Sequence, residues 1–558
     1  MEKIKIKING NEVEVDQGKT ILQVAKEMNL HIPTLCYLEP LSPQGACRLC
    51  LVEDRGKLVT SCTTPVAPNM DVKLDTQNVI ESRKLILQLL FTERNHYCMY
   101  CEASGDCELQ KLGYEFGLDH FEFPTYEKKF TIDNSHDYIV MDPNRCVLCR
   151  RCVRACSELA GHFVLGEMNR GIETLIIADM NLPLGESSCV SCGLCVQVCP
   201  TGALMDKRSV YLGKEIQTDI VYSNCNECAV GCGTKVYKKK NSNFIVKIYG
   251  DMDCEINDGV LCKLGRYSAL FEERPRVISN KIKDDFGFRK TDTEKILRLI
   301  NEKLSDLIVY VDGSLFNEEL ELVKSVFKDK VYSLYPNKPK IPTNISLNEL
   351  KNSNEFIVIG VDLNREYGVI GSFVKRKVLA QEGKLTLFDG EYNSLAEISN
   401  FVFNINELKD GLNKIKDWKN PVVIYKELSD EAKELLLSLN NLKFLWLPPE
   451  PNSIGLLNYK IKHEKKESKN ILFIGENSQG LKDFDKDSFV IVFTPYETDD
   501  VLKKANVIVS IPNGYEREGS FYNIENKLVK KSKVLNPKFE TVDLKTLLNE
   551  LNKETLIK

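Results

Sequence analysis

Residues 145–156 have the sequence RCVLCRRCVRAC, in which the cysteines follow the spacing C-x2-C-x2-C-x3-C. The same spacing recurs over residues 189–199, and Pro200 follows its last cysteine. This repeat is typical of bacterial ferredoxins with two [4Fe-4S] clusters, in which the fourth cysteine of each run binds the other cluster. We therefore predict two interleaved ligand sets, namely Cys146, Cys149, Cys152 with Cys199, and Cys189, Cys192, Cys195 with Cys156. Interleaving keeps the two clusters close together, as electron transfer requires.

A first group of cysteines precedes this pair and has the spacing C-x10-C-x2-C-x11-C. It consists of Cys36, Cys47, Cys50 and Cys62, and Gly45 allows the backbone to turn tightly beside it. Four thiolates from one loop region predict a [2Fe-2S] cluster. A zinc knuckle is the alternative interpretation, although zinc sites prefer two matched C-x2-C pairs.

A second group, Cys98, Cys101 and Cys107, offers three thiolates for a further [4Fe-4S] cluster. His96 is the nearest residue that could supply the fourth ligand. A neutral imidazole ligand is expected to raise the cluster potential, as histidines do in Rieske centres. The alternative is that His96 is an ordinary core or surface histidine.

The last group is Cys225, Cys228 and Cys232, for which Cys262 and Cys254 compete as the fourth ligand. We prefer Cys262, because the segment 259–266 resembles the loop that closes this kind of site in molybdopterin-type enzymes. This set predicts a fourth [4Fe-4S] cluster, and Cys254 is then a plain thiol. The chain has 20 cysteines and none follows Cys262. Disulfides are a poor interpretation, because many of these thiols stand only two residues apart.

Composition limits the possible partners. The chain has 558 residues, which is long enough for several domains, and its net charge of −5 does not favour binding to nucleic acid or to an anionic membrane. Residues 1–8 alternate charged residues with isoleucine, which is the pattern of a strand and not of a signal peptide. No apolar run reaches the roughly 18 residues of a spanning helix. We therefore expect a cytoplasmic protein without direct membrane insertion.

The apolar pattern predicts a multidomain fold of mixed α+β and α/β class. A strand before the Asn9-Gly10 turn, a return strand and a helix near residues 21–28 favour a β-grasp sheet, and residues 78–91 favour a buried helix. The cysteine segments 138–210 and 218–272 have little room for a hydrophobic core, so we expect metal to drive their folding. Beyond residue 273 apolar runs alternate with helix-capable stretches, which indicates a parallel α/β domain in two lobes. The runs are 307–311, 356–361, 422–425, 471–474, 489–493 and 507–511.

These patterns divide the chain into five predicted domains. In order they are a β-grasp [2Fe-2S] domain, a helical His/Cys3 [4Fe-4S] domain, a two-cluster ferredoxin domain, a molybdopterin-type [4Fe-4S] domain and a reduced molybdopterin-oxidoreductase-like α/β domain. Their predicted bounds are 1–77, 78–137, 138–210, 218–272 and 273–558.

In this order the motifs resemble the large iron-sulfur subunit of NADH:quinone oxidoreductase, often called the G or 75-kilodalton subunit. They also resemble the homologous subunits of NAD(P)-linked hydrogenases and formate dehydrogenases. The matching segments are Gly45–Val52, Asn95-His96 with Cys98, Gly105–Gln110 and Arg145–Cys156, with weaker matches at 505–509 and 518–525. The family places three residues between its ligand histidine and the first cysteine, so Arg94 here occupies the usual histidine position.

The resemblance implies an electron-transfer subunit with one [2Fe-2S] and four [4Fe-4S] clusters and with no substrate-converting site of its own. The implied partners are a flavin-containing NAD(P)H-oxidising subunit, a small [2Fe-2S] subunit, a terminal redox subunit that is hydrogenase-like or belongs to a quinone module, and ferredoxin. We favour a soluble NAD(P)-linked or electron-bifurcating hydrogenase. The alternatives are the peripheral arm of NADH:quinone oxidoreductase and a formate dehydrogenase with catalytic molybdenum or tungsten. No molybdopterin is expected, because no cysteine follows Cys262 to bind such a metal.

Overall fold

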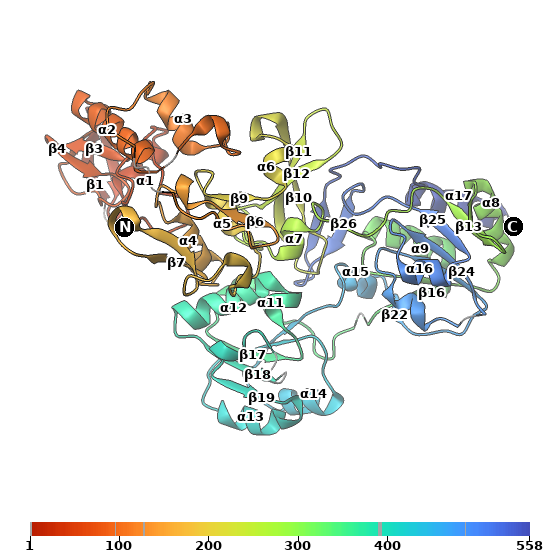
Figure 1. Cartoon of the computed structure of the whole chain (residues 1–558). Coiled ribbons are helices and arrows are strands. Elements are labelled where there is room, and N and C mark those ends of the chain that lie inside the picture. The colour runs from red at the N-terminus through yellow and green to blue at the C-terminus, as the bar shows by residue number, and fades with distance from the viewer. Residues whose placement is uncertain are drawn as a thin grey trace. The chain divides into compact units, whose positions relative to one another are not determined.

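The computed structural model describes residues 3–94, 96–125, 129–336, 338–388, 393–485 and 487–557 (Figure 1). The chain forms two compact units, Met1–Gln217 and Thr218–Lys558. Asn95, which takes part in the family resemblance, lies outside the described residues. In the part of the chain that the structure describes, no helix is both long enough and apolar enough to cross a membrane.

The first unit begins with a mixed sheet whose strands lie in the order β2-β1-β5-β3-β4. Alternate residues of the first strand, Ile4, Ile6 and Ile8, are buried against helix α1, as the period of two predicts. The hairpin turns at Asn9 and Gly10, which both have positive φ. The elements are β1 (Lys3–Ile8), β2 (Asn11–Asp16), α1 (Ile21–Glu27), β3 (Leu51–Asp54), β4 (Lys57–Thr60) and β5 (Asp71–Lys73).

The rest of the first unit consists of short elements separated by the cysteine loops. The helix predicted over residues 78–91 is confirmed as α2 (Gln77–Glu93), which buries Val79, Leu87 and Phe91. The other helices are α3 (Glu108–Glu115), α4 (Arg151–Arg154), α5 (Leu194–Val198) and α6 (Ser209–Leu212). Two small antiparallel pairs complete the unit, β6 (Ile139–Met141) with β9 (Leu204–Asp206), and β7 (Leu165–Met168) with β8 (Leu175–Ala178).

Arginines of the RCVLCRRCVRAC stretch fasten the cysteine loops to one another. Arg151 pairs with Glu108 at 2.6 Å and donates to the carbonyl of Tyr37 at 3.0 Å. Arg154 donates to the carbonyls of Cys36 at 2.5 Å and of Cys149 at 3.3 Å. Both side chains are buried, so their hydrogen bonds hold the loops without competition from water.

The second unit begins with an antiparallel sheet that the sequence did not predict. Its strands are β10 (Thr218–Asn224), β11 (Gly233–Lys239) and β12 (Ile245–Gly250). The expectation of little hydrophobic core is wrong here, because Val236, Ile245 and Ile248 share one core with a parallel sheet that follows. It is also wrong for residues 138–210, where Ile139, Leu165 and other apolar residues pack around the cysteines.

Each of the six predicted apolar runs beyond residue 273 forms a strand, and together they belong to two separate parallel sheets. One sheet has the order β14-β13-β25-β24-β23-β15-β16-β22, with an antiparallel edge at β13 and β14, and the other has the order β19-β18-β17-β20-β21. Strands of the first sheet are β13 (Lys281–Asp284), β14 (Gly287–Lys290), β15 (Leu307–Val311), β16 (Val331–Ser333), β22 (Lys462–His463), β23 (Asn470–Ile474), β24 (Phe489–Thr494) and β25 (Val507–Ser510). Strands of the second are β17 (Glu355–Ile359), β18 (Lys384–Phe388), β19 (Phe401–Phe403), β20 (Val422–Tyr425) and β21 (Lys443–Trp446).

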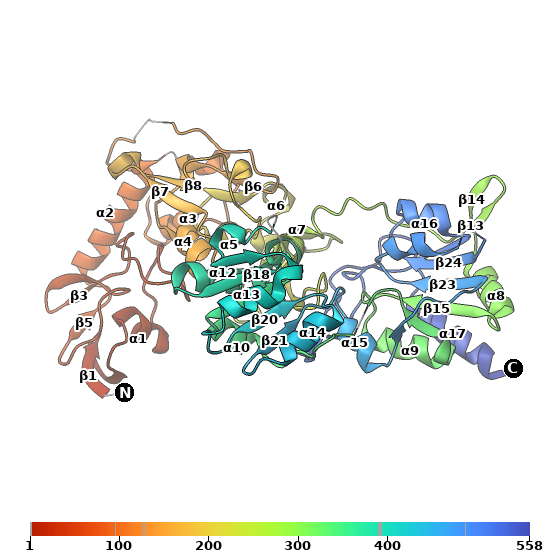
Figure 2. The same ribbon diagram turned by 90° about the horizontal axis from the view of Figure 1, so that it is seen from below.

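Helices cover both faces of each parallel sheet. In the first sheet α8 (Thr293–Lys303), α9 (Asn317–Phe327) and α17 (Leu544–Ile557) pack on one face and α16 (Asp499–Lys504) on the other (Figure 2). In the second sheet α12 (Gly368–Ala380) covers one face together with the cysteine loop 225–232, while α13 (Leu408–Lys414) and α14 (Asp430–Leu437) cover the opposite face. The last cysteine group is therefore built onto a large α/β core.

We expect Phe356→Ala to lower the free energy of unfolding of this lobe by about 3–5 kcal/mol, because the Phe356 ring is fully buried in the core of the second sheet. Phe286→Ala is the matched control, since that ring is 88% exposed. Denaturant titration followed by tryptophan fluorescence measures the effect, and both tryptophans, Trp418 and Trp446, pack in the same lobe. Equal midpoints for the two variants would contradict this packing.

Candidate metal centres

The first cysteine set is buried, and two of its members, Cys50 and Cys62, pack in one hydrophobic cluster with the N-terminal sheet. Cys36, Cys47, Cys50 and Cys62 are all buried, and the sulfurs of Cys50 and Cys62 lie 3.3 Å apart and share one hydrogen bond. Hydrogen bonds from Cys47 and Cys62 lower the pKa of Cys36 to about 2, and a hydrogen bond with Cys62 lowers the pKa of Cys50 to about 7. The same hydrogen bonds, together with burial, raise the pKa values of Cys47 and Cys62 well above the ordinary range. The four sulfurs therefore share protons among themselves, and a bound metal has to replace the protons that Cys47 and Cys62 keep.

The second set lines one cavity together with His96. Cys98, Cys101 and Cys107 surround it, and Gly202 closes it so tightly that an added Cβ would lie 2.9 Å from the Cys101 sulfur. The His96 Nε2 atom is buried and has no hydrogen-bond partner among the described residues. Burial, with the charges of Arg145 and Arg94, lowers the pKa of His96 to about 4, so the ring is neutral near pH 7. A neutral imidazole with a free nitrogen is what ligation requires.

The third set lines a separate cavity. Cys146, Cys149, Cys152 and Cys199 come from two distant segments and meet around it, beside Thr174. Burial raises the pKa of Cys146 and of Cys149 to about 12. Burial disfavours free thiolates in this cavity, yet four cysteine side chains meet there. A metal group that binds the sulfurs directly would stabilise their deprotonated form.

The fourth set repeats the backbone of the third. Leu148 and Arg150 have positive φ, and so do Ser191 and Gly193 at the corresponding positions. The Leu148 N–H donates to Cys146 Sγ at 3.4 Å, and the Ser191 N–H donates to Cys189 Sγ at the same distance. The fourth predicted set is Cys189, Cys192, Cys195 and Cys156. Of these, Cys156, Cys189 and Cys195 pack in one hydrophobic cluster with residues of the third set. Cys156 lies on a π-helical turn, Ala155–Leu159.

The fifth set lies in the second unit. An added Cβ at Gly265 would lie 3.3 Å from Cys225 Sγ and 3.9 Å from Cys262 Sγ, so these two sulfurs face the same glycine. Cys254 packs instead against Gly233, where an added Cβ would lie 2.6 Å from its sulfur. The structure thus supports the set Cys225, Cys228, Cys232 and Cys262, of which Cys225 and Cys232 are buried and Cys228 and Cys262 half-buried. Burial raises the pKa of Cys228 to about 12.

These donor sets fit iron-sulfur clusters by their chemistry, since four sets supply thiolates alone and one supplies three thiolates and an imidazole. Among the described residues no three His, Cys, Asp or Glu side chains come close enough together to hold a single metal ion. The spacing in the sequence predicts all of these residues as ligands. It missed the residues that shape the cavities, such as Gly202 and Gly265, because nothing in their local sequence signals the distant cysteine that each one faces.

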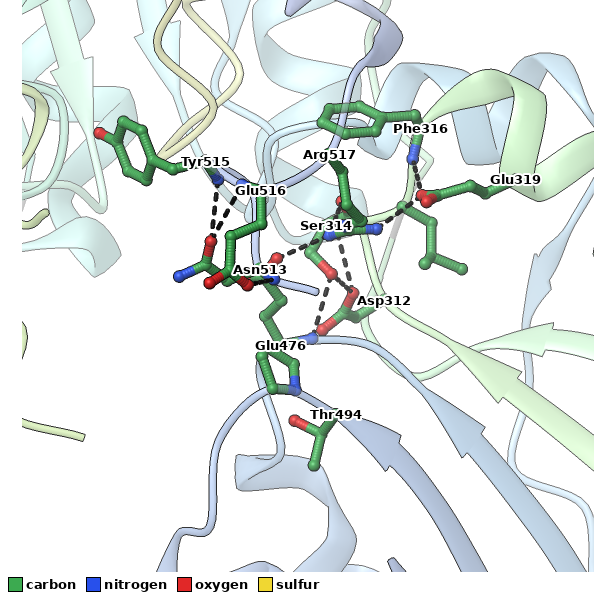
Figure 3. A network of polar contacts seen from close by, with 12 residues as sticks. Asp312, Ser314, Phe316, Glu319, Glu476, Thr494, Asn513, Tyr515, Glu516 and Arg517 are labelled. Carbon is green, nitrogen blue, oxygen red and sulfur yellow. Dashed lines mark hydrogen bonds and ion pairs between the residues drawn. The ribbon is translucent and has the colours of Figure 1, made fainter. Parts of the chain in front are cut away.

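Apart from the cysteine sets, a cluster of polar side chains lies where the strands of the first parallel sheet end (Figure 3). Asp312 directly follows β15, and its carboxylate accepts hydrogen bonds from the N–H groups of Ser314 at 2.9 Å and Asn477 at 2.6 Å. In open α/β sheets ligands bind in the crevice at this edge, where the strand order reverses. Here the N–H groups of Ser314 and Asn477, which could otherwise hold an anionic ligand, already donate to the carboxylate of Asp312.

Buried charges fill the rest of this edge (Figure 3). Arg517 pairs with Glu319 at 2.7 Å and with Glu476 at 2.6 Å. Glu450 accepts from the Gly313 N–H at 2.8 Å. Burial raises the pKa of Asp312 to about 6, and burial together with Asp312 raises the pKa of Glu450 well above its ordinary range. A carboxylate-lined edge of this kind does not fit the phosphates of a dinucleotide cofactor.

We expect Arg517→Met to lower the free energy of unfolding of the second unit by about 3–5 kcal/mol, because it leaves the carboxylates of Glu319 and Glu476 buried without a partner. Arg298→Met is the matched control, since the Arg298 side chain is 79% exposed and its pair with Glu294 is worth little. Calorimetry of the two variants measures the difference. An unchanged transition in Arg517→Met would mean that the network does not hold this edge together.

Comparison with known protein families assigns consecutive segments of the chain. Residues 1–77 match a 2Fe-2S iron-sulfur cluster binding domain, and residues 83–122 match the NADH-ubiquinone oxidoreductase-G iron-sulfur binding region. Residues 136–205 match the ferredoxin-like domain of NADH-quinone oxidoreductase subunit 3, and residues 218–271 match the molybdopterin oxidoreductase Fe4S4 domain.

Individual relatives agree with these matches. The G 2 subunit of NADH-quinone oxidoreductase from Rhizobium meliloti (strain 1021) is 33% identical over 312 residues, which cover 54% of this chain and 35% of that protein. The gamma subunit of NAD-reducing hydrogenase HoxS of Cupriavidus necator is 33% identical over 209 residues, which cover 37% of this chain and 89% of that subunit. The NADH-ubiquinone oxidoreductase 75 kDa subunit of Reclinomonas americana is 25% identical over 463 residues, 75% of this chain and 66% of that protein. The chain spans about a third of the length of the first of these relatives.

Proposed function

Because the chain belongs to the family of iron-sulfur subunits that includes the G-type subunits of NADH-quinone oxidoreductase and the gamma subunit of NAD-reducing hydrogenase, we propose that it relays electrons within an NAD(P)H-linked oxidoreductase complex. The observation that carries this proposal is the packing of the ligand sets in the first unit. One hydrophobic cluster contains Cys36 of the first set, Cys149 of the third and, at its edge, Cys98 of the second. A second cluster joins the third set to the fourth.

In this proposal each set has one group to hold. The first holds a [2Fe-2S] cluster through Cys36, Cys47, Cys50 and Cys62, and the second holds a [4Fe-4S] cluster through His96, Cys98, Cys101 and Cys107. The two ferredoxin-type sets and the set of Cys225, Cys228, Cys232 and Cys262 hold one [4Fe-4S] cluster each. The clusters supply one-electron chemistry, and the chain supplies their spacing, burial and hydrogen bonding.

The finer fold assignment follows the same reasoning. The mixed N-terminal sheet supports a β-grasp domain at residues 1–77, followed by cluster modules at 78–137, 138–210 and 218–272. The paired parallel sheets support a reduced molybdopterin-oxidoreductase-like domain at residues 273–558. We infer that this last domain acts as a scaffold without molybdopterin, because its crevice is filled by Asp312, Arg517 and their partners.

The proposed complex contains a flavin-bearing NAD(P)H-oxidising subunit, a small [2Fe-2S] subunit and a terminal redox subunit, with ferredoxin as a further electron partner. The 33% identity to a subunit of an NAD-reducing hydrogenase supports a hydrogenase-type or electron-bifurcating complex in the cytoplasm. The similarity to a G-type subunit of NADH-quinone oxidoreductase supports the peripheral arm of a quinone-reducing complex as the second candidate.

Anaerobic purification with native partners tests the function. We expect about eighteen irons per chain, two from one [2Fe-2S] and sixteen from four [4Fe-4S] clusters, and no molybdenum or tungsten. The identities of the co-eluting subunits distinguish a hydrogenase-type complex from a quinone-reducing one. Stoichiometric molybdenum would instead indicate a catalytic subunit, and an iron-free or zinc-only protein would reject the relay.

His96→Ala tests the ligand set of the second cavity. We expect this variant to lose or shift one [4Fe-4S] electron paramagnetic resonance signal while the [2Fe-2S] signal persists, because the His96 Nε2 atom is the free nitrogen of that cavity. His120→Ala is the control, since His120 is exposed and pairs with Asp119 at 2.6 Å. A spectrum identical to that of the unmodified protein would exclude ligation by His96.

A further inference from the structure

Arg94 is a buried arginine directly after the C-terminal end of α2. It is 2% exposed, and its Nη2 atom donates to the carbonyl of Thr174 at 2.6 Å. Its guanidinium carbon lies 4.3 Å from the centre of the Phe130 ring. The Nε and Nη1 atoms are buried and have no hydrogen-bond partner in the described part of the chain.

An unpaired buried guanidinium is costly, because desolvation of the charge and of its N–H donors is not repaid. Two other buried arginines have carboxylate partners, since Arg151 pairs with Glu108 and Arg517 with Glu319, and buried Arg154 donates to several carbonyl oxygens. Arg94 has no carboxylate within ion-pair distance among the described residues. Its positive charge therefore needs a negative partner that the described side chains do not supply.

The position of Arg94 indicates what that partner is. Thr174, which accepts its hydrogen bond, lines the cavity of the third set, and Phe91 and His96 on either side of it in the sequence line the cavity of the second set. The Arg94 guanidinium is thus bonded to a residue of the third cavity, and its backbone stands between two residues of the second.

We propose that Arg94 is a fixed positive charge that raises the reduction potentials of the clusters held by the second and third sets. This inference rests on the proposed function, since it presumes clusters at both sets. A nearby cation favours the more negative, reduced state of a cluster, and hydrogen bonds to cluster sulfurs act in the same direction.

Arg94→Gln removes the charge and keeps a polar side chain, whereas Arg94→Lys keeps the charge. In redox titrations of the holo-complex followed by electron paramagnetic resonance, we expect Arg94→Gln to move the midpoint potentials of two [4Fe-4S] signals to more negative values. The [2Fe-2S] signal of the first set should not move. Arg94→Lys should stay close to the unmodified protein. Arg170→Gln, which changes an exposed arginine of the same unit, should move none of the signals.

The outcomes separate the inference from the function on which it rests. Unmodified protein without [4Fe-4S] signals would reject the proposed function itself. Full iron content with unmoved potentials in Arg94→Gln would overturn the role of Arg94 alone, as would equal shifts in Arg94→Gln and Arg94→Lys. If Arg94→Gln loses iron, the Arg94→Lys variant decides. Retained iron and unchanged potentials in Arg94→Lys would support a role for the positive charge. Loss of iron in Arg94→Lys as well would show that the bond to Thr174 is purely structural and would overturn the proposal.

Discussion

The burial of thiols and charges without water is the constraint on which the rest of this structure depends. A desolvated thiolate is stable only when it is coordinated or receives hydrogen bonds. The chain meets this condition with backbone N–H groups, such as those of Leu148 and Ser191, aimed at cysteine sulfurs. Buried arginines then tie the cysteine loops together through carbonyl oxygens, as Arg154 does for Cys36 and Cys149.

The two units meet the same constraint in opposite ways. The first unit gathers thiols into cavities and leaves polar atoms such as His96 Nε2 without partners among the described residues, which is the mark of a site built around another group. At the sheet edge of the second unit, polar side chains pair with one another or with the backbone. Asp312 accepts a hydrogen bond from the Ser314 N–H, and Arg517 pairs with Glu476. The contrast supports an electron relay in the first unit and a scaffold at the sheet edge of the second.

Much of the fold followed from periodicity. The hairpin at Asn9-Gly10, helix α2 and the parallel strands beyond residue 273 were predictable, because alternation and long apolar runs are local properties of the chain. The sheet of β10, β11 and β12 was not predicted, because its core is completed by residues more than 100 positions away, such as Phe356 and Phe373. Short strands such as β18 and β21 were missed for the same reason, since their burial comes from neighbouring strands and helices.

The sequence by itself determined the cysteine spacing from which metal ligands are predicted, because ligand spacing within a loop is a short-range property of the order of residues. The sequence also predicted that Cys199 joins Cys146 and that Cys262 rather than Cys254 joins Cys225. Only the tertiary structure decided what surrounds these residues: it placed Gly202 against Cys101 and Gly265 against Cys225, and it buried Arg94 with a hydrogen bond to Thr174. These juxtapositions depend on contacts between distant segments, and the energy of burying a charge is fixed by everything that surrounds it.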